Sequence, residues 1–310
     1  MSEKSVEVFA PATVANVACG FDVLGFALEK PGDRVIARRC DRKGVYLKSI
    51  HIENGKLPLE VEKNSAGMAA LSLWRAENPP FGIELELYKN LPLGSGLGSS
   101  AASSAAGVAA ANFLLENPLP IKELIPFAME GERVACGSAH ADNVAPALIG
   151  GFTLIRSYDP LEVISLVTKL TLYCSIVIPD IEIKTQEARA ILKPEIPMDQ
   201  AIRQWGNLGA LVAGLLQGDV GLVGRSLTDH VIEHQRAILI PHFSEIKTAA
   251  LESGALGCSI SGSGPAIFAL SASESHADEI ASAMARIFHQ NHIPCRHWSS
   301  PINQHGISII

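Results

Sequence analysis

The sequence predicts a two-domain α+β protein, because segments with the two-residue alternation of strands interleave with segments of helical spacing to the end of the chain. The 310 residues exceed one typical domain, and 47% hydrophobic residues supply enough apolar material for two cores. The pattern restarts near Tyr158, Asp159 and Pro160, so we place the domains at residues 1–157 and 158–310. For the second domain we expect a small α/β sandwich, with helices on one face of an antiparallel sheet.

Alternating apolar and polar side chains predict a β-rich first domain. The expected strands cover residues 6–9, 23–28, 34–39, 45–52, 82–89 and 151–156. Pro11 breaks the first strand, and turn residues at 31–33 and 41–44 separate the next ones. Helical spacing predicts helices over residues 64–75 and 121–135.

The second domain continues with the same mixture of elements. We expect strands over residues 172–178 and on both sides of 260–265, and helices over residues 185–192, 199–216, 219–233, 243–253 and 277–289.

Composition and charge exclude several classes of protein. The 25 basic and 32 acidic residues give a net charge of −7, and no run of five basic residues appears, so we expect no nucleic-acid partner. No run of 18 apolar residues appears. Glu3, Lys4 and Glu7 lie where a signal peptide would need an unbroken apolar stretch. We therefore expect no membrane partner and a cytoplasmic location. The six cysteines, none in a C-x-x-C pair, are typical of reduced buried thiols.

One segment of the first domain has the composition of an anion-binding loop. From residue 94 to residue 111, every position except Leu97 and Val108 is Gly, Ser or Ala. We expect a loop that leads into a helix beginning near Ser99 or Ser100. Glycine lets the backbone approach an anion, and the N–H groups and dipole of the following helix can hold a phosphate without a basic side chain. The predicted nucleotide-binding segment is Leu91, Pro92, Leu93, Gly94, Ser95, Gly96, Leu97, Gly98, Ser99, Ser100 and Ala101.

This loop resembles the second of three motifs that define the GHMP kinases. The segments 10–16 and 20–25 resemble the first motif, and residues 257–265 resemble the third. The three motifs occur in the family's order and span nearly the whole chain. The resemblance implies a two-domain GHMP kinase fold, with an N-terminal α/β domain like that of a ribosomal protein and a C-terminal ferredoxin-like α/β sandwich. It also implies ATP and Mg²⁺ as cofactors, and a small-molecule alcohol as the phosphate acceptor.

Within the family, segments 140–146 and 184–189 are similar to those of members that phosphorylate the amino acid L-homoserine. The resemblance assigns Asp22 to the ammonium of this substrate, and Arg189 and Arg236 to its carboxylate. A forked guanidinium suits a carboxylate well. Asn16 would orient the hydroxyl toward the γ-phosphate. Relatives are commonly dimers, so we also expect a homodimer.

Further positions receive roles from the same resemblance. Glu132 and the hydroxyl of Ser100 would bind magnesium, with Ser99 as a possible substitute for Ser100. The amide of Asn143 would lie at the reacting end beside Asp142, where some relatives have an aspartate base. Because an amide cannot act as a base, we expect positioning and charge stabilisation to dominate catalysis. The remaining candidates are His140 and Thr185 in the polar wall of the site, and Asn64 near the adenine.

Two other functions stay open on the sequence alone. Another GHMP kinase, acting on mevalonate or a sugar alcohol, would not need Asp22, Arg189 and Arg236 as an amino-acid site. A non-catalytic nucleotide sensor would not need Glu132 and Ser100. The pattern H-x-x-E-H at residues 230–234 matches an inverted zinc-protease motif, but without a visible third ligand we interpret it as a chance match.

Overall fold

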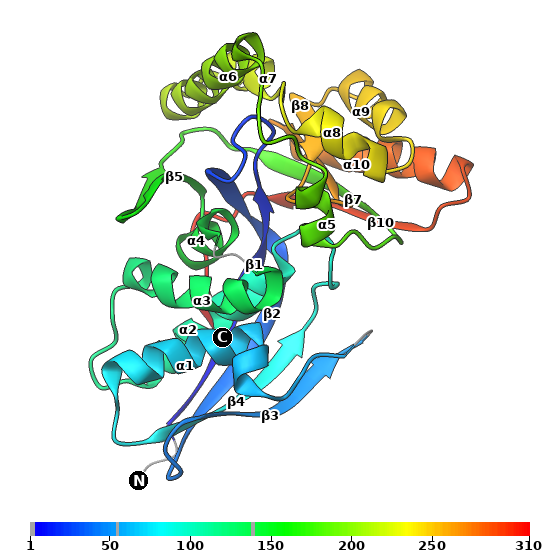
Figure 1. Ribbon diagram of the computed structural model, residues 1–310. Helices are drawn as coiled ribbons and strands as arrows, with labels where there is room; N and C mark the ends of the chain where they lie inside the picture. Colours follow the sequence, from blue (N-terminus) through cyan, green and yellow to red (C-terminus); the bar gives the residue numbers. More distant parts are fainter. Residues whose placement is uncertain (1–3, 54–55, 138–139) are drawn as a thin grey trace.

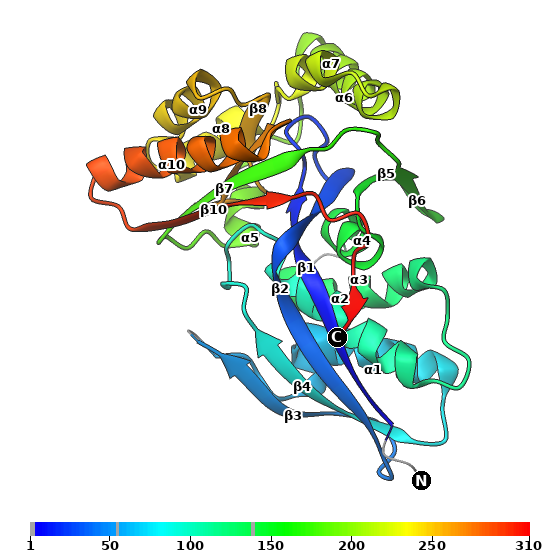
Figure 2. The same cartoon turned by 180° about the vertical axis from the view of Figure 1, so that it is seen from behind.

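A computed structural model describes residues 4–53, 56–137 and 140–310. The first part of the chain is built on a seven-stranded sheet of the described residues, in which strands β11-β1-β2-β4-β3 are neighbours in that order, β5 pairs with β2, and β6 pairs with β5. The strands are β1 (Ser5–Ala15), β2 (Leu24–Cys40), β3 (Val45–Ile52), β4 (Gly82–Lys89), β5 (Phe152–Tyr158), β6 (Leu161–Leu166) and β11 (Ser308–Ile309). Four helices pack on one face of this sheet, as Figures 1 and 2 show from opposite sides.

The helices of the first part are α1 (Ser65–Glu77), α2 (Ser99–Leu114), α3 (Ile125–Cys136) and α4 (Ala141–Ile149), with short 3-10 turns η1 (Val61–Lys63) and η2 (Ile121–Leu124). Helix α2 lies among the other three and against the sheet, and almost all of its residues are buried. Its small side chains permit this position: a Cβ on Gly107 would lie 2.4 Å from the carbonyl oxygen of Ala66 in α1. The Ala-rich composition is therefore a consequence of close packing on every side of α2.

Two strands are longer than the sequence predicts. Strand β1 continues through Pro11 with a bulge, and β2 is one strand where we expected two. Gly32 explains the second difference, because a Cβ there would lie 2.3 Å from the carbonyl oxygen of Ala10. Gly32 thus marks a close approach of two paired strands and not the end of one.

The second part is a four-stranded antiparallel sheet in the order β10-β7-β9-β8. Its strands are β7 (Tyr173–Pro179), β8 (Gly257–Ile260), β9 (Ile267–Ser271) and β10 (Cys295–Pro301). Helices α9 (Phe243–Glu252) and α10 (Glu274–Gln290) pack against it. The predicted α+β class and the antiparallel sheet with packed helices are confirmed. The predicted division at residue 157 falls inside the β5–β6 hairpin, and β11 returns from the end of the chain to pair with β1.

The remaining helices are α5 (Thr185–Ala190), α6 (Met198–Gln217), α7 (Val220–Ser226) and α8 (Glu233–Arg236), followed by the 3-10 turn η3 (Ala237–Leu239). The predicted helix over residues 219–233 is wrong, because α7 ends at Ser226. The side chain of Asp229 accepts hydrogen bonds from the N–H groups of Val231, Ile232 and Glu233, which folds this segment into a turn. In the ranges the structure describes, no helix combines the length and apolar character needed to span a membrane.

Candidate active site

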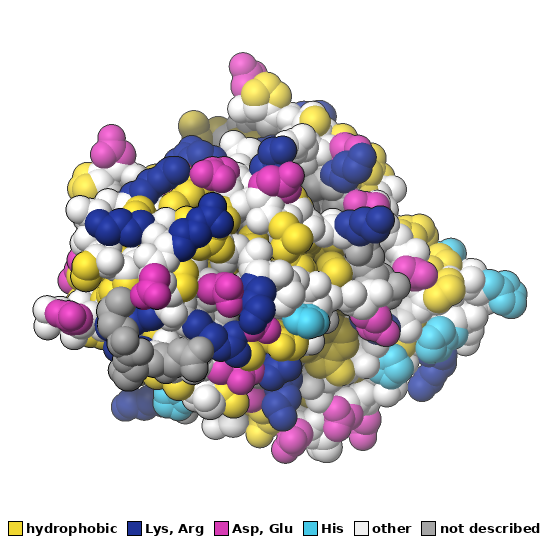
Figure 3. All heavy atoms as spheres, turned by 90° about the horizontal axis from the view of Figure 1, so that it is seen from below, with side chains coloured by type: hydrophobic (Ala, Val, Ile, Leu, Met, Phe, Trp, Pro, Cys, Tyr) yellow, Lys and Arg dark blue, Asp and Glu magenta, His cyan; other side chains and the backbone are white. Residues whose placement is uncertain are grey.

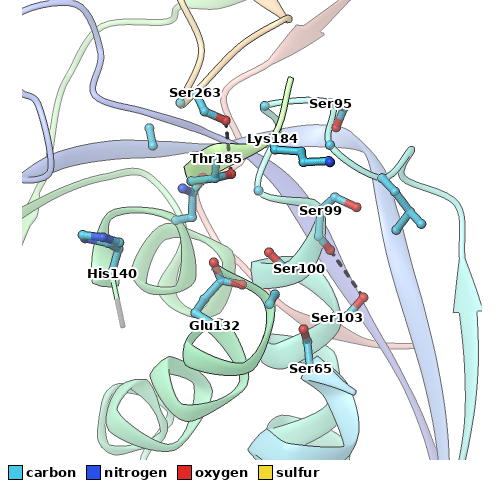
Figure 4. Close-up of a pocket in the computed structure, with 18 of the residues that line it drawn as sticks. Ser65, Ser95, Ser99, Ser100, Ser103, Glu132, His140, Lys184, Thr185 and Ser263 are labelled. Carbon is cyan, nitrogen blue, oxygen red and sulfur yellow. Dashed lines mark hydrogen bonds between the residues drawn. The ribbon is translucent and has the colours of Figure 1, made fainter. Parts of the chain in front are cut away.

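A cavity of about 440 Å³ collects side chains from all three sequence motifs (Figure 4). Most of the predicted site residues line it: Asp22, Asn64, Leu93, Gly94, Ser95, Gly96, Gly98, Ser99, Ser100, Glu132, His140, Asp142, Asn143, Thr185, Arg189 and Arg236. Five predicted residues do not line it: Asn16, Leu91, Pro92, Leu97 and Ala101, of which all but Pro92 are buried. The cavity therefore unites groups that are far apart in the sequence, from both parts of the chain.

The glycine-rich loop adopts a backbone that only glycine accepts easily. Gly94, Gly96 and Gly98 have φ of 63°, 79° and 60°. Gly96 also lies against the third motif, where a Cβ would be 2.6 Å from the carbonyl oxygen of Ser261. The hydroxyl of Ser261 donates a 2.7 Å hydrogen bond to the carbonyl of Gly96, so the two motifs hold each other in place.

Helix α2 begins directly behind this loop. Gly98 is its N-cap residue, and the first turn contains no acidic residue. The first N–H groups of α2 and the positive end of its dipole therefore point toward the cavity without a carboxylate of the helix to neutralise them. Helix N-termini of this geometry can bind anions, and the sequence predicts nucleotide binding by residues 91–101.

A buried ion pair beneath the loop escaped the sequence analysis. The ammonium of Lys89 contacts the carboxylate of Asp33 and donates a 2.6 Å hydrogen bond to the carbonyl of Ser99. The other oxygen of Asp33 accepts 3.0 Å hydrogen bonds from the N–H groups of Asn90 and Leu91. Burial lowers the pKa of Lys89, and Asp33 opposes this shift. One signal was available: in the alternation of residues 83–89, Lys89 continues the inward-facing series.

The far end of the cavity holds two guanidinium groups and a carboxylate. Arg189 donates two hydrogen bonds to Asp22, at 3.0 and 2.7 Å. Arg236 is buried and donates to the carbonyl oxygens of Ala188 and Gly262, at 3.1 and 2.8 Å. The ring of Phe21 lies within 5.3 Å of both guanidinium carbons. The hydrogen bonds to Asp22 raise the pKa of Arg189, and burial lowers the pKa of Arg236 to about 10.

Two further ionisable groups lie at this end of the cavity: His140, directly before α4, and Asp142 in its first turn. Nδ1 of His140 lies 3.9 Å from the carboxylate of Asp22, and burial lowers the pKa of His140. Asp142 is buried, and burial together with the charges of Asp22 and Glu132 raises its pKa to about 7. Oδ1 of Asp142 has no hydrogen-bond partner among the described residues.

The three asparagines of the predicted site are all engaged within the protein. Asn16 donates to the carbonyl of Gly262 and accepts from the N–H of Asp22, at 2.8 and 3.1 Å. Asn143 accepts a 2.7 Å hydrogen bond from the hydroxyl of Thr13. Asn64 caps α1 by accepting from the N–H groups of Ala66 and Gly67, as its position before the helix predicts.

Oxygen atoms suited to magnesium gather beside the start of α2. Figure 4 shows the carboxylate of Glu132 on α3 directed toward the first turn of α2, where Ser100 lies. A carboxylate and a hydroxyl are hard oxygen ligands, and a magnesium ion in a nucleotide site usually takes only one or two protein ligands. Accordingly, the described residues contain no cluster of three His, Cys, Asp or Glu that could bind a metal by themselves. The donor set therefore fits Mg²⁺ bound together with phosphates.

The polar wall opposite comes from the second part of the chain. The hydroxyls of Thr185 and Ser263 lie 3.3 Å apart at the cavity surface (Figure 4). The H-x-x-E-H pattern lies elsewhere in the fold, and its Glu233 is engaged with Lys247 and with the hydroxyl of Ser259. On the face seen in Figure 3, acidic and basic side chains are interspersed.

Comparisons with known proteins agree with this geometry. Residues 64–151 match the model of the GHMP kinase N-terminal domain, and residues 211–290 match that of the C-terminal domain. The chain is 52% identical to a homoserine kinase from Chlorobium phaeovibrioides, over 99% of this chain and all of the relative. It is 41% identical to a homoserine kinase from Xylella fastidiosa, over 97% of this chain and 93% of the relative.

Solved structures extend the comparison to the fold. The crystal structure of a homoserine kinase from Cytophaga hutchinsonii is 54% identical and superposes with a TM-score of 0.96, over 100% of this chain and 98% of that chain. The mevalonate kinase of L. major shares the fold alone, with 16% identity and a TM-score of 0.73 over 98% and 97% of the two chains. The expected fold is thereby confirmed. The chain belongs to the GHMP kinase family and, within it, to the homoserine kinases.

Proposed function

We propose that the chain transfers the γ-phosphate of ATP to the side-chain hydroxyl of L-homoserine, giving O-phospho-L-homoserine and ADP in threonine biosynthesis. The observation that carries this proposal is the placement of Asp22, Arg189 and Arg236 in the wall of the same cavity as the glycine-rich loop before α2. A carboxylate and two guanidiniums match the ammonium and carboxylate of an amino acid.

The nucleotide end would use mainly backbone groups. The N–H groups of the loop and the first turn of α2 would bind the phosphates, and Lys89 with Asp33 would hold the two ends of the loop together. Ser100 and Glu132 would bind Mg²⁺, which neutralises charge on the β- and γ-phosphates when bound. The hydrophobic side chains of Leu57 and Leu93 line the cavity and would face the base.

The amino-acid end would place the acceptor hydroxyl. Arg189 and Arg236 would bind the carboxylate, and Asp22 with His140 would bind the ammonium. Because Asn16 bonds to the backbone of Asp22, it would act by fixing the loop that carries this carboxylate. Asn143 and Thr185 would lie near the transferred phosphate. The hydroxyl would lose its proton late, to the phosphate itself, so that positioning supplies most of the rate acceleration.

An assay for ADP release tests this function. With magnesium and ATP, we expect turnover with L-homoserine and little with L-serine, L-threonine or mevalonate. Arg189→Ala should lower kcat/KM for homoserine by at least about 100-fold, because a charge-assisted carboxylate contact is lost. Arg156→Ala, in an exposed pair with Glu162, is the matched control and should retain activity. Turnover with mevalonate, or ATP binding without turnover of any acceptor, would refute the proposal.

We also propose that the enzyme works in the cytoplasm as a homodimer. Met198, Ile202 and Trp205 support the second point, because they are 67%, 59% and 61% exposed and follow one another at helical spacing on α6. Sedimentation of the full chain should give twice the 32.9 kDa mass, and Trp205→Glu should shift it toward the monomer. A wild-type chain that sediments as a monomer at micromolar concentration would contradict the dimer.

A further inference from the structure

The ion pair between Asp22 and Arg189 joins the two side chains assigned to opposite charges of the substrate. Both line the cavity, on a loop of the first part and on α5 of the second. Their two hydrogen bonds, at 3.0 and 2.7 Å, engage both carboxylate oxygens and both terminal nitrogens. A ligand charge that binds either group therefore competes with this ion pair.

The surroundings allow Arg189 to change partner without moving far. Its Nε is buried and has no hydrogen-bond partner among the described residues, so a donor remains for a second carboxylate. Arg236 differs, because two backbone carbonyls hold it from behind in the same cavity wall. Arg236 is thus the fixed guanidinium of this wall, to which the carboxylate of a ligand would bind. Arg189 would turn from Asp22 to the same ligand carboxylate.

Charge balance at this end favours a ligand that carries both signs. Asp22 and Arg189 neutralise each other, and Asp142 offsets the charge of Arg236 when it is ionised. A ligand with only a carboxylate would take Arg189 from Asp22 and leave that carboxylate unpaired. A ligand with only an ammonium would leave Arg189 unpaired. A zwitterion replaces one ion pair with two and leaves no charge without a partner.

We propose that the Asp22–Arg189 ion pair is a specificity device that opens by exchange, so that the ammonium of an amino acid takes Asp22 while its carboxylate takes Arg189 beside Arg236. This inference rests on the proposed function and adds the rule by which the site rejects ligands with a single charge. No covalent bond changes in the exchange.

Calorimetric titration of the full chain with magnesium and ADP, at pH 8, tests the exchange. The ligands are L-homoserine, 4-hydroxybutanoate, which lacks the ammonium, and 3-amino-1-propanol, which lacks the carboxylate. The unaltered chain should bind homoserine at least about 100-fold more tightly than either analogue, since each analogue leaves one partly buried charge unpaired. Asp22→Asn should bind homoserine more weakly, yet bind 4-hydroxybutanoate about tenfold more tightly than the unaltered chain, because Arg189 is already free. Arg189→Met should bind homoserine more weakly and 3-amino-1-propanol more tightly than the unaltered chain, because Asp22 is then free.

Asp142→Asn is the matched control for a simple charge effect. It removes a negative charge from the same cavity but leaves the Asp22–Arg189 pair closed, so the exchange predicts a gain for 4-hydroxybutanoate well below that of Asp22→Asn. Equal gains in affinity for 4-hydroxybutanoate in the two variants, or no gain in Asp22→Asn, would overturn the exchange. Neither result would contradict the proposed phosphorylation of homoserine. Failure of the unaltered chain to bind or phosphorylate homoserine would overturn the proposed function itself.

Discussion

Asp142 illustrates how one buried carboxyl group links the site to stability. Its pKa is about 7 in the folded chain, mainly because of burial, and about 4 in an unfolded chain. Between these values the folded state binds more protons than the unfolded state. The free energy of unfolding contributed by this group is therefore fully present below pH 4 and is lost as the pH rises through 7.

Asp142→Asn removes this dependence, because an amide does not ionise. We expect the variant to exceed the wild type in free energy of unfolding by about 4 kcal/mol at pH 8 and to match it near pH 4. Urea unfolding of both proteins at the two pH values measures the difference. An effect of the same size at both pH values would mean that ionisation of Asp142 is not its cause.

The second prediction at the scale of single residues concerns Glu132. Glu132→Gln keeps the shape of the side chain but removes the charge that suits Mg²⁺, so we expect kcat to fall by about 100-fold or more and the magnesium requirement to rise. Initial rates over a magnesium titration provide the measurement. Glu130→Gln, two residues away on the same helix in an exposed pair with Arg133, is the control. Similar losses in both variants would argue against a magnesium role for Glu132.

At the scale of elements, the glycine-rich loop at residues 94–98 depends on two different properties of glycine. Gly94 and Gly96 both have positive φ, but a Cβ on Gly94 would lie 3.5 Å from its nearest neighbour, a carbon of Glu182. On Gly96 it would clash with the backbone of the third motif. Alanine at position 94 therefore meets only conformational strain, whereas alanine at position 96 must also displace the loop.

We expect Gly96→Ala to raise KM for ATP by at least about 100-fold, and Gly94→Ala by less than about tenfold, from strain of about 1 kcal/mol. Steady-state kinetics at saturating homoserine separate the two effects. If Gly94→Ala raises KM for ATP as much as Gly96→Ala does, contact with the third motif does not determine the conformation of the loop.

The ion pair of Lys89 in β4 and Asp33 in β2 lies against the start of α2, where Lys89 also donates to the carbonyl of Ser99. Lys89→Met leaves a buried carboxylate without its partner, and we expect a loss of about 3–5 kcal/mol in the free energy of unfolding. The double variant with Asp33→Asn removes the unpaired charge and should recover part of this loss. Urea unfolding of both variants measures the recovery, and a double variant no more stable than Lys89→Met would show that the unpaired charge is not the cause.

Elements with a strong local signal were predictable from the sequence. The alternation in residues 82–89 and the cap at Asn64 gave β4 and α1 almost to the residue. Two failures had different causes. Gly32 lies in a segment with turn residues, but the distant strand it faces determines its role. The bonds that Asp229 accepts from residues two to four positions later are local, and the helical spacing of residues 219–233 does not register such a turn.

At the scale of the whole molecule, the cavity exists because the two parts of the chain meet around it. Asp22 and Arg189 are 167 positions apart, and Asn16 and Gly262 are 246 apart. The ring of Phe26 in β2 packs edge-on against Phe268 in β9, which joins the cores of the two sheets. No local pattern reveals such pairs. The motifs of the sequence predicted most of the residues that line the cavity, while the Asp22–Arg189 bond and the absence of Asn16 from the lining required the structure.

Phosphorus NMR of the reaction mixture tests most directly where the phosphate goes. With ATP, magnesium and L-homoserine, we expect a new phosphomonoester resonance coupled to the two protons of the side-chain CH₂ group, appearing at the rate of ADP formation. A resonance of an acyl phosphate on the homoserine carboxylate, or inorganic phosphate as the only product, would show that the side-chain hydroxyl is not the acceptor.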